Sequence, residues 1–114
     1  MSGTAVEEYI NGLSGEQAWL AASIWRSIEM HVTDVRGTVV DGHPVWYRGE
    51  EPIVALETHG DRTTVTVWRG QLVDDPSGRL TAVGDEQAAT VEYAGRSDFD
   101  GAMLREWLQR ALAL

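Results

Sequence analysis

Residues 53–68 read IVALETHGDRTTVTVW and carry the pattern that decides the fold. The first six residues begin as an apolar run and end polar, which is typical of a β-strand. Gly60-Asp61 then has the Gly-X form of a two-residue hairpin turn. Residues 63–68 alternate almost perfectly, so two valines lie on one face of a strand and Trp68 lies on the other face with two threonines. Because a tight hairpin joins antiparallel strands, this stretch predicts an antiparallel sheet.

Further strands are expected on both sides of this hairpin. Residues 38–40 lead into the turn dipeptide Asp41-Gly42, and residues 45–47 follow with aromatic and β-branched side chains that suit a pleated surface. After a long ordered loop over residues 71–87, residues 90–93 read TVEY and predict one more strand. We therefore expect a sheet of four to five strands.

Helical periodicity lies before and after the strands. A capping box of the S/T-x-x-E form at residues 4–7 predicts a helix start, and a second box with Gln at its last position opens a longer helix at Ser14. Residues 97–100 read SDFD and are expected to cap a final helix with a leucine-rich face. Segregated helices and strands of this kind define an α+β domain, with the N-terminal and C-terminal helices covering one face of the antiparallel sheet.

The composition limits the chemistry available to the domain. The chain has 114 residues, which suits one domain over residues 1–114. It contains no cysteine, so thiolate nucleophiles and thiolate metal sites are excluded. No G-x-S-x-G or comparable catalytic motif is recognisable, and we assign no catalytic residue. A non-enzymatic protein is therefore expected.

Charge and hydropathy also restrict the partners. The chain carries 18 acidic and 9 basic side chains, and its net charge of −9 opposes binding to a phosphate backbone, so nucleic acid is not expected as a partner. No stretch approaches the ~18 consecutive apolar residues of a membrane span, so no membrane partner is expected. The first residues lack the basic head and apolar stretch of a secretory signal, and we expect a cytoplasmic protein.

Carboxylates offer one type of candidate site. Glu7, Glu8 and Glu16 lie on or beside the first two predicted helices, and hard cations such as Fe(II) accept clustered oxygen ligands. The alternative is that these residues favour helix N-termini and keep the surface solvated. Glu57 and His59 share one face of a predicted strand, but two ligands do not make a metal site, and the favoured interpretation is that His59 is an exposed polar residue before the turn.

Aromatic side chains offer a second type of site, because small-molecule pockets combine aromatic walls with a few polar groups. Alternation places Trp46 and Tyr47 on opposite faces, so only one of them faces the core and the other lines a cleft or an interface. The alternative is core packing plus one exposed aromatic residue. The candidate pocket residues are His43, Trp46, Tyr47, Trp68 and Arg69, with Arg48 close by in the chain.

The tryptophan content favours self-association as well. Five tryptophans are more than the core of a small domain obviously needs, and aromatic residues often anchor interfaces. If Val65 and Val67 face the helices, Trp68 projects from the open face of the sheet, where a symmetric homodimer would bury it.

Short motifs follow one another along nearly the whole chain. They are Gly42-His43-Pro44-Val45-Trp46-Tyr47, Trp68-Arg69-Gly70, Asp75-Pro76-Ser77-Gly78 with Leu80 and Gly84, and Ser97-Asp98-Phe99-Asp100. Their order and spacing, together with Glu7-Glu8-Tyr9 in the first helix, resemble the YdhG-like family of small bacterial domains of unknown function. The resemblance implies an α+β fold similar to frataxin, and some relatives are described as frataxin-like proteins of intracellular iron handling.

These observations leave three functions open. The leading expectation is a frataxin-like cytoplasmic protein that binds Fe(II) weakly through Glu7, Glu8 and Glu16. The first alternative is a module whose aromatic pocket binds a small organic ligand. The second is a structural or protein-interaction domain without a ligand.

Overall fold

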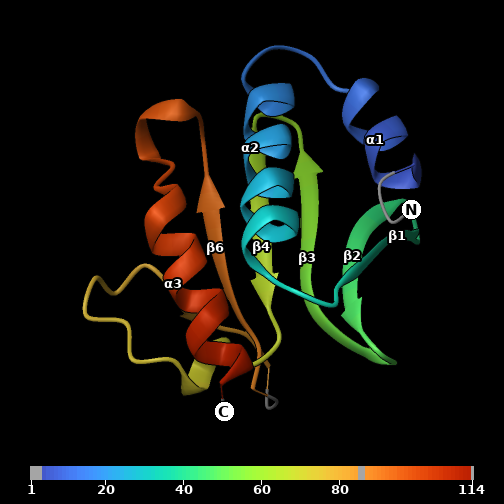
Figure 1. Ribbon diagram of the computed structural model, residues 1–114. Helices are drawn as coiled ribbons and strands as arrows, with labels where there is room; N and C mark the ends of the chain where they lie inside the picture. The colour runs from blue at the N-terminus through green and yellow to red at the C-terminus, as the bar shows by residue number, and fades with distance from the viewer. Residues whose placement is uncertain (1–3, 85–86, 114) are drawn as a thin grey trace.

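Two helices precede the strands and a third follows them (Figure 1). The computed structural model describes residues 4–84 and 87–113. The helices are α1 (Thr4–Asn11), α2 (Gly15–His31) and α3 (Gly101–Leu112), with short 3-10 turns η1 (Gly70–Leu72) and η2 (Arg96–Asp98). The strands are β1 (Arg36–Val40), β2 (His43–Arg48), β3 (Glu51–His59), β4 (Arg62–Val67), β5 (Thr81–Ala82) and β6 (Ala89–Tyr93).

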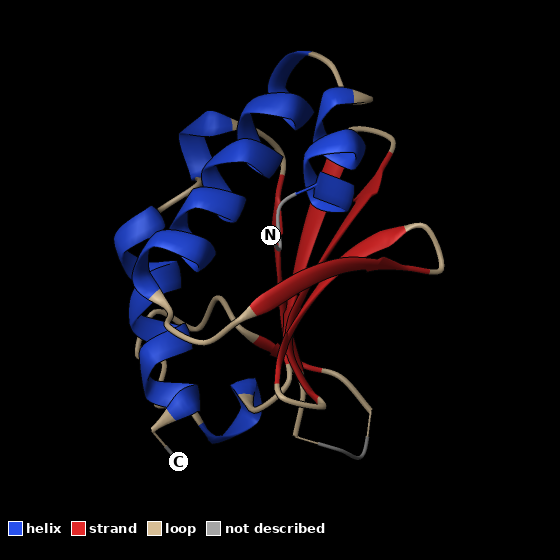
Figure 2. Cartoon of the chain, turned by 45° about the vertical axis from the view of Figure 1, so that its right-hand side comes forward, coloured by secondary structure: helices blue, strands red, loops and turns tan. Residues whose placement is uncertain are grey.

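The strands form one sheet in the order β1-β2-β3-β4-β6-β5, and every neighbouring pair is antiparallel. The helices lie together on one side of this sheet (Figure 2). The predicted α+β class and the antiparallel sheet are thus confirmed. The sheet has one strand more than expected, because residues 81–82 inside the predicted loop pair with residues 89–90 of β6. Both residues of β5 are exposed, so no periodic apolar pattern marks them in the sequence.

The two predicted hairpin turns form where expected. Asp41 and Gly42 connect β1 to β2 with φ angles of 52° and 83°, the left-handed geometry that a type I′ turn requires at both positions. Gly60 has a φ of 59° between β3 and β4. These turns fix the register that places alternate side chains of the central strands against the helices.

The core lies between the sheet and the helices. Val65 and Val67 of β4 are buried in it, as their alternation predicts. Trp46 is fully buried in the same core, whereas Tyr47 is half-buried, so alternation also separates these two neighbours correctly. The buried helix residues include Leu20, Ala21, Ile24 and Ile28 of α2 and Leu104, Trp107, Leu108 and Ala111 of α3.

The helix starts are correct, but one predicted capping box does not form. Ser14 is the N-cap residue of α2, yet its side chain makes no capping hydrogen bond. Gln17 instead accepts a hydrogen bond from the hydroxyl of the buried Thr63 on β4, so tertiary packing replaces the local box. Asp100 caps α3 as predicted, and its carboxylate accepts a hydrogen bond from the Met103 amide at 3.1 Å.

Among the described residues, no helix combines the length and the apolar character that crossing a membrane requires.

Candidate functional site

The three candidate iron ligands lie on the surface. Glu7 and Glu8 are exposed on α1, where α1 packs against the β1–β2 side of the sheet. Glu16 lies in the first turn of α2, and its Oε2 atom accepts a hydrogen bond from the Arg96 amide at 3.1 Å and lies 3.5 Å from the Arg96 guanidinium. Glu16 therefore ties α2 to the segment before α3.

The carboxylates do not form a metal centre within residues 4–84 and 87–113. No group of three or more His, Asp or Glu side chains there is arranged to hold a metal ion. The Glu57–His59 pair does form, with 2.7 Å between Oε2 and Nε2, but His59 is exposed and Glu57 is only half-buried. His43 packs beside it, with 5.7 Å between the two imidazole centroids. Glu57, His59 and the nearby His43 ring thus lie close together, but they do not form a complete set of metal ligands.

The predicted aromatic pocket is divided between separate places in the structure. The indole nitrogen of the buried Trp46 donates a hydrogen bond to the half-buried Glu29 at 3.0 Å, and Trp25 donates to the same carboxylate oxygen at 2.8 Å. The Arg36 guanidinium lies over the Tyr47 ring, with 5.5 Å between the guanidinium carbon and the ring centroid. These residues, like His43, therefore have structural partners away from Trp68 and Arg69.

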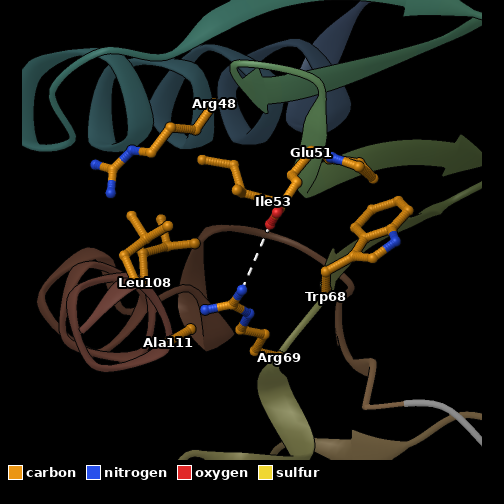
Figure 3. A pocket seen from close by; sticks show the side chains of 9 residues that line it. Arg48, Glu51, Ile53, Trp68, Arg69, Leu108 and Ala111 are labelled. Carbon is orange, nitrogen blue, oxygen red and sulfur yellow. Dashed lines mark hydrogen bonds and ion pairs between the residues drawn. The ribbon is translucent and has the colours of Figure 1, made fainter. Parts of the chain in front are cut away.

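Trp68 and Arg69 line a pocket at the end of the sheet (Figure 3). β4 ends at Val67, and the half-buried Trp68 beyond it shares this pocket with the last turns of α3, a placement that the strand alternation does not predict. The pocket has a volume of about 220 Å³. Its lining residues are Arg48, Glu51, Pro52, Ile53, Trp68, Arg69, Leu108, Ala111 and Leu112.

The pocket brings charged and apolar groups into contact. Arg69 forms an ion pair with Glu51, with 3.4 Å between Nη2 and Oε2. Arg48 donates a hydrogen bond from Nη2 to the Thr33 carbonyl at 3.0 Å. Its Nε atom is shielded from solvent and has no hydrogen-bond partner among the described residues. One wall is thus polar, and the facing wall of α3 is aliphatic.

Arg48 also lines a second, more open hollow, beside His31, Thr33 and Gln109. Leu112 belongs to both hollows. Arg48 therefore lies between the pocket and a more open, polar surface.

Part of this site is predictable from the sequence. Trp68 and Arg69 are among the predicted pocket residues, and Arg48 lies next to another of these residues in the chain. Leu108 and Leu112 belong to the leucine-rich face of the last predicted helix and are not predicted to line a pocket. The available signal is that the apolar stripe of α3 continues to Leu112, the last residue of the helix.

Comparison of the chain with family models, with curated proteins and with solved structures finds no match. The resemblance to the YdhG-like family therefore stays a prediction.

Proposed function

We propose that this protein is a non-enzymatic module that binds a small organic molecule in the pocket between the end of the sheet and α3. The observation that carries the proposal is the combination of an aliphatic wall, the Trp68 ring and two guanidinium groups around one enclosed volume. Small-molecule sites are concave, mostly apolar, and contain a few polar groups that fix the orientation of the ligand. This pocket has each of these properties.

The volume of the pocket limits the size of the ligand. Pockets for drug-sized molecules commonly measure about 300–1,000 Å³, and this one measures about 220 Å³. A ligand with one ring or a short chain fits such a space. The proposal therefore concerns a compound of metabolite size and not a cofactor such as a dinucleotide.

A fragment titration followed by NMR tests the proposal. The indole N–H signal of Trp68 is assigned by its loss in Trp68→Phe, and the four other tryptophans serve as internal controls. We expect neutral single-ring fragments to shift the Trp68 signal and the backbone signals of residues 108–112. If no fragment at millimolar concentration moves these signals, the pocket does not bind small molecules and the proposal is wrong.

Weak Fe(II) binding through Glu7, Glu8 and Glu16 stays a separate prediction. The exposure of Glu7 and Glu8 supports loose surface binding, because carboxylates without imidazole or thiolate hold Fe(II) weakly. Anaerobic calorimetry on the parent and on a variant with all three residues changed to Ala measures this directly. Equal heats of binding in the two proteins would place any iron elsewhere.

A cytoplasmic location is part of the proposal, as is the absence of nucleic-acid and membrane partners. The net charge of −9 supports the exclusion of nucleic acid. Cell fractionation of the full-length protein tests the location.

A further inference from the structure

The electrostatics of the pocket indicate what kind of molecule it binds. We infer that the ligand is a small organic monoanion whose carboxylate binds Arg48 and whose apolar body lies between Trp68 and α3. This inference rests on the proposed function of the pocket and adds the chemical class of its ligand.

Arg48 is a cation whose hydrogen-bonding capacity is largely unused. A guanidinium group has five N–H donors, and the structure gives Arg48 one acceptor, the Thr33 carbonyl. Its Nε atom is buried without a partner, and Arg48 forms no ion pair with any described residue. Among the described residues, the Nη groups bond only the Thr33 carbonyl, and a carboxylate is the acceptor that matches a guanidinium group best. The free protein thus holds a donor set that an anion would satisfy.

The balance of charge around the pocket favours a single negative charge on the ligand. Arg69 is engaged by Glu51 at 3.4 Å. Arg48 then contributes the one positive charge that no lining residue neutralises. A phosphate dianion would exceed this charge, and the protein's net charge of −9 opposes a dianion about twice as strongly as a monoanion. A monocarboxylate matches it.

The shape of the pocket places the two ends of such a ligand. Arg48 comes from the end of β2 and lies above Leu108, whereas Trp68 lies on the opposite side of the pocket (Figure 3). A carboxylate at Arg48 directs the rest of the molecule toward Leu108, Ile53 and the Trp68 ring. The open hollow beside Arg48 lets the carboxylate keep part of its hydration, which lowers the desolvation penalty of binding.

Benzoate and benzamide form the matched pair of probes for this inference. They share one ring and nearly one shape, but only benzoate is charged at neutral pH. We expect the protein to bind benzoate at least about tenfold more tightly than benzamide, a difference of about 1.4 kcal/mol in binding free energy. The shift of the Trp68 indole N–H signal during each titration gives the affinity. Inorganic phosphate is titrated in parallel, and we expect no shift at Trp68 below the concentration that saturates with benzoate.

Substitutions at Arg48 assign the effect to one side chain. Arg48→Gln is expected to reduce benzoate affinity to the benzamide level and to leave benzamide affinity unchanged. Arg48→Lys keeps the charge but removes the bidentate fork, so an intermediate affinity is expected. Arg26→Gln is the control, because Arg26 is exposed on α2 and its loss changes the net charge by the same amount. The dispersion of the amide spectrum shows that each variant is folded.

Four results would overturn the inference. Equal affinity for benzoate and benzamide would show that the pocket binds apolar rings without selecting an anion, and the proposed function would stand. An equal loss of benzoate binding in Arg26→Gln would show a general charge effect. Binding of neither probe, or tighter binding of phosphate, would also reject a monocarboxylate ligand, while the neutral fragments would still decide whether the pocket binds small molecules.

Discussion

At the scale of single residues, Trp46 and Tyr47 show how alternation separates two adjacent aromatic side chains. Trp46 is fully buried and donates to Glu29, whereas Tyr47 is half-buried beside Arg36. Trp46→Ala leaves a large cavity and should lower the free energy of unfolding by about 3–5 kcal/mol, while Tyr47→Ala should lower it far less. Urea denaturation measures both values. Equal losses in the two variants would show that Tyr47 is as important to the core as Trp46.

Tyr93 has an unusual environment for a hydroxyl group. Its side chain is fully buried, and its oxygen has no hydrogen-bond partner among the described residues. The Arg79 guanidinium lies 5.3 Å from the ring centroid, a contact that phenylalanine would keep. We therefore expect Tyr93→Phe to match or exceed the parent in urea denaturation, because an unsatisfied buried hydroxyl is removed. A loss above about 1 kcal/mol would reveal a hydrogen bond to this hydroxyl.

The same residue predicts a response to alkaline pH. Burial raises the pKa of Tyr93 above its ordinary value, since the charged phenolate is poorly solvated in the core. A raised pKa means that the unfolded state releases its proton first, so the contribution of Tyr93 is present below about pH 10 and is lost as the pH rises above it. Tyr93→Phe should flatten the alkaline fall in stability. Identical pH profiles for the two proteins would contradict this assignment.

At the scale of elements, Asp75 connects the loop between β4 and β6 to α3 by side-chain hydrogen bonds. Its carboxylate accepts hydrogen bonds from the Leu80 amide at 2.9 Å, the Ser77 amide at 3.2 Å and the Trp107 indole at 3.3 Å. Burial opposes ionisation, but the hydrogen bonds from Leu80, Ser77 and Trp107 outweigh it and lower the pKa of Asp75. One side chain thus joins residues that lie far apart in the sequence.

This lowered pKa predicts the acid response of the loop. A carboxyl group with a depressed folded-state pKa stabilises the fold above its unfolded pKa of about 3.9, and the stabilisation is lost as the pH falls through the folded-state value. Asp75→Asn should therefore be less stable than the parent at pH 7 and should show a shallower loss of stability between about pH 4 and pH 2. Thermal unfolding over this pH range measures the difference. Asp74→Asn is the neighbouring control, because Asp74 is exposed and its substitution removes the same charge.

The same scale shows what the sequence can and cannot predict. Hairpins such as Asp41-Gly42 are predictable because their turn chemistry is local. The strand β5 is not, since its two exposed residues owe their conformation to pairing with β6. Gly70 illustrates a similar dependence. A Cβ atom at this position would lie 2.6 Å from the Cβ atom of Ala89. This close approach of η1 to β6 cannot be predicted from any local sequence pattern.

The candidate site also combines features that the local sequence predicts with features that depend on tertiary contacts. Trp68 and Arg69 are recognisable from their residue types. The role of Arg48 depends on Thr33, 15 positions earlier in the chain, and on the end of α3. The helix position of Glu16 suggests an iron ligand, whereas its contacts in the fold are with Arg96, 80 positions later in the chain. Non-local contacts of this kind decide which charged side chains are satisfied within the fold.

At the scale of the whole molecule, self-association as a symmetric homodimer stays a prediction. Trp68 is half-buried in the pocket, so a dimer that covers it would also cover Arg48 or Arg69. Sedimentation velocity near physiological salt, where repulsion is screened over about 8 Å, compares the parent with Trp68→Ser. A parent dimer that the substitution converts to a monomer would support the homodimer over the ligand pocket, because the two compete for the Trp68 side chain. A parent that stays monomeric at high micromolar concentration would exclude the dimer.

The most direct test of the account compares fragment binding in the parent with binding in a variant whose pocket is filled. Ala111 lines the pocket from α3, and Ala111→Leu adds an aliphatic group at this wall. The account predicts that single-ring fragments shift the Trp68 indole signal in the parent and lose at least about tenfold in affinity in the folded variant, a difference of about 1.4 kcal/mol. Unchanged affinity in Ala111→Leu, or fragment shifts that avoid Trp68, would contradict the assignment of this pocket as the binding site.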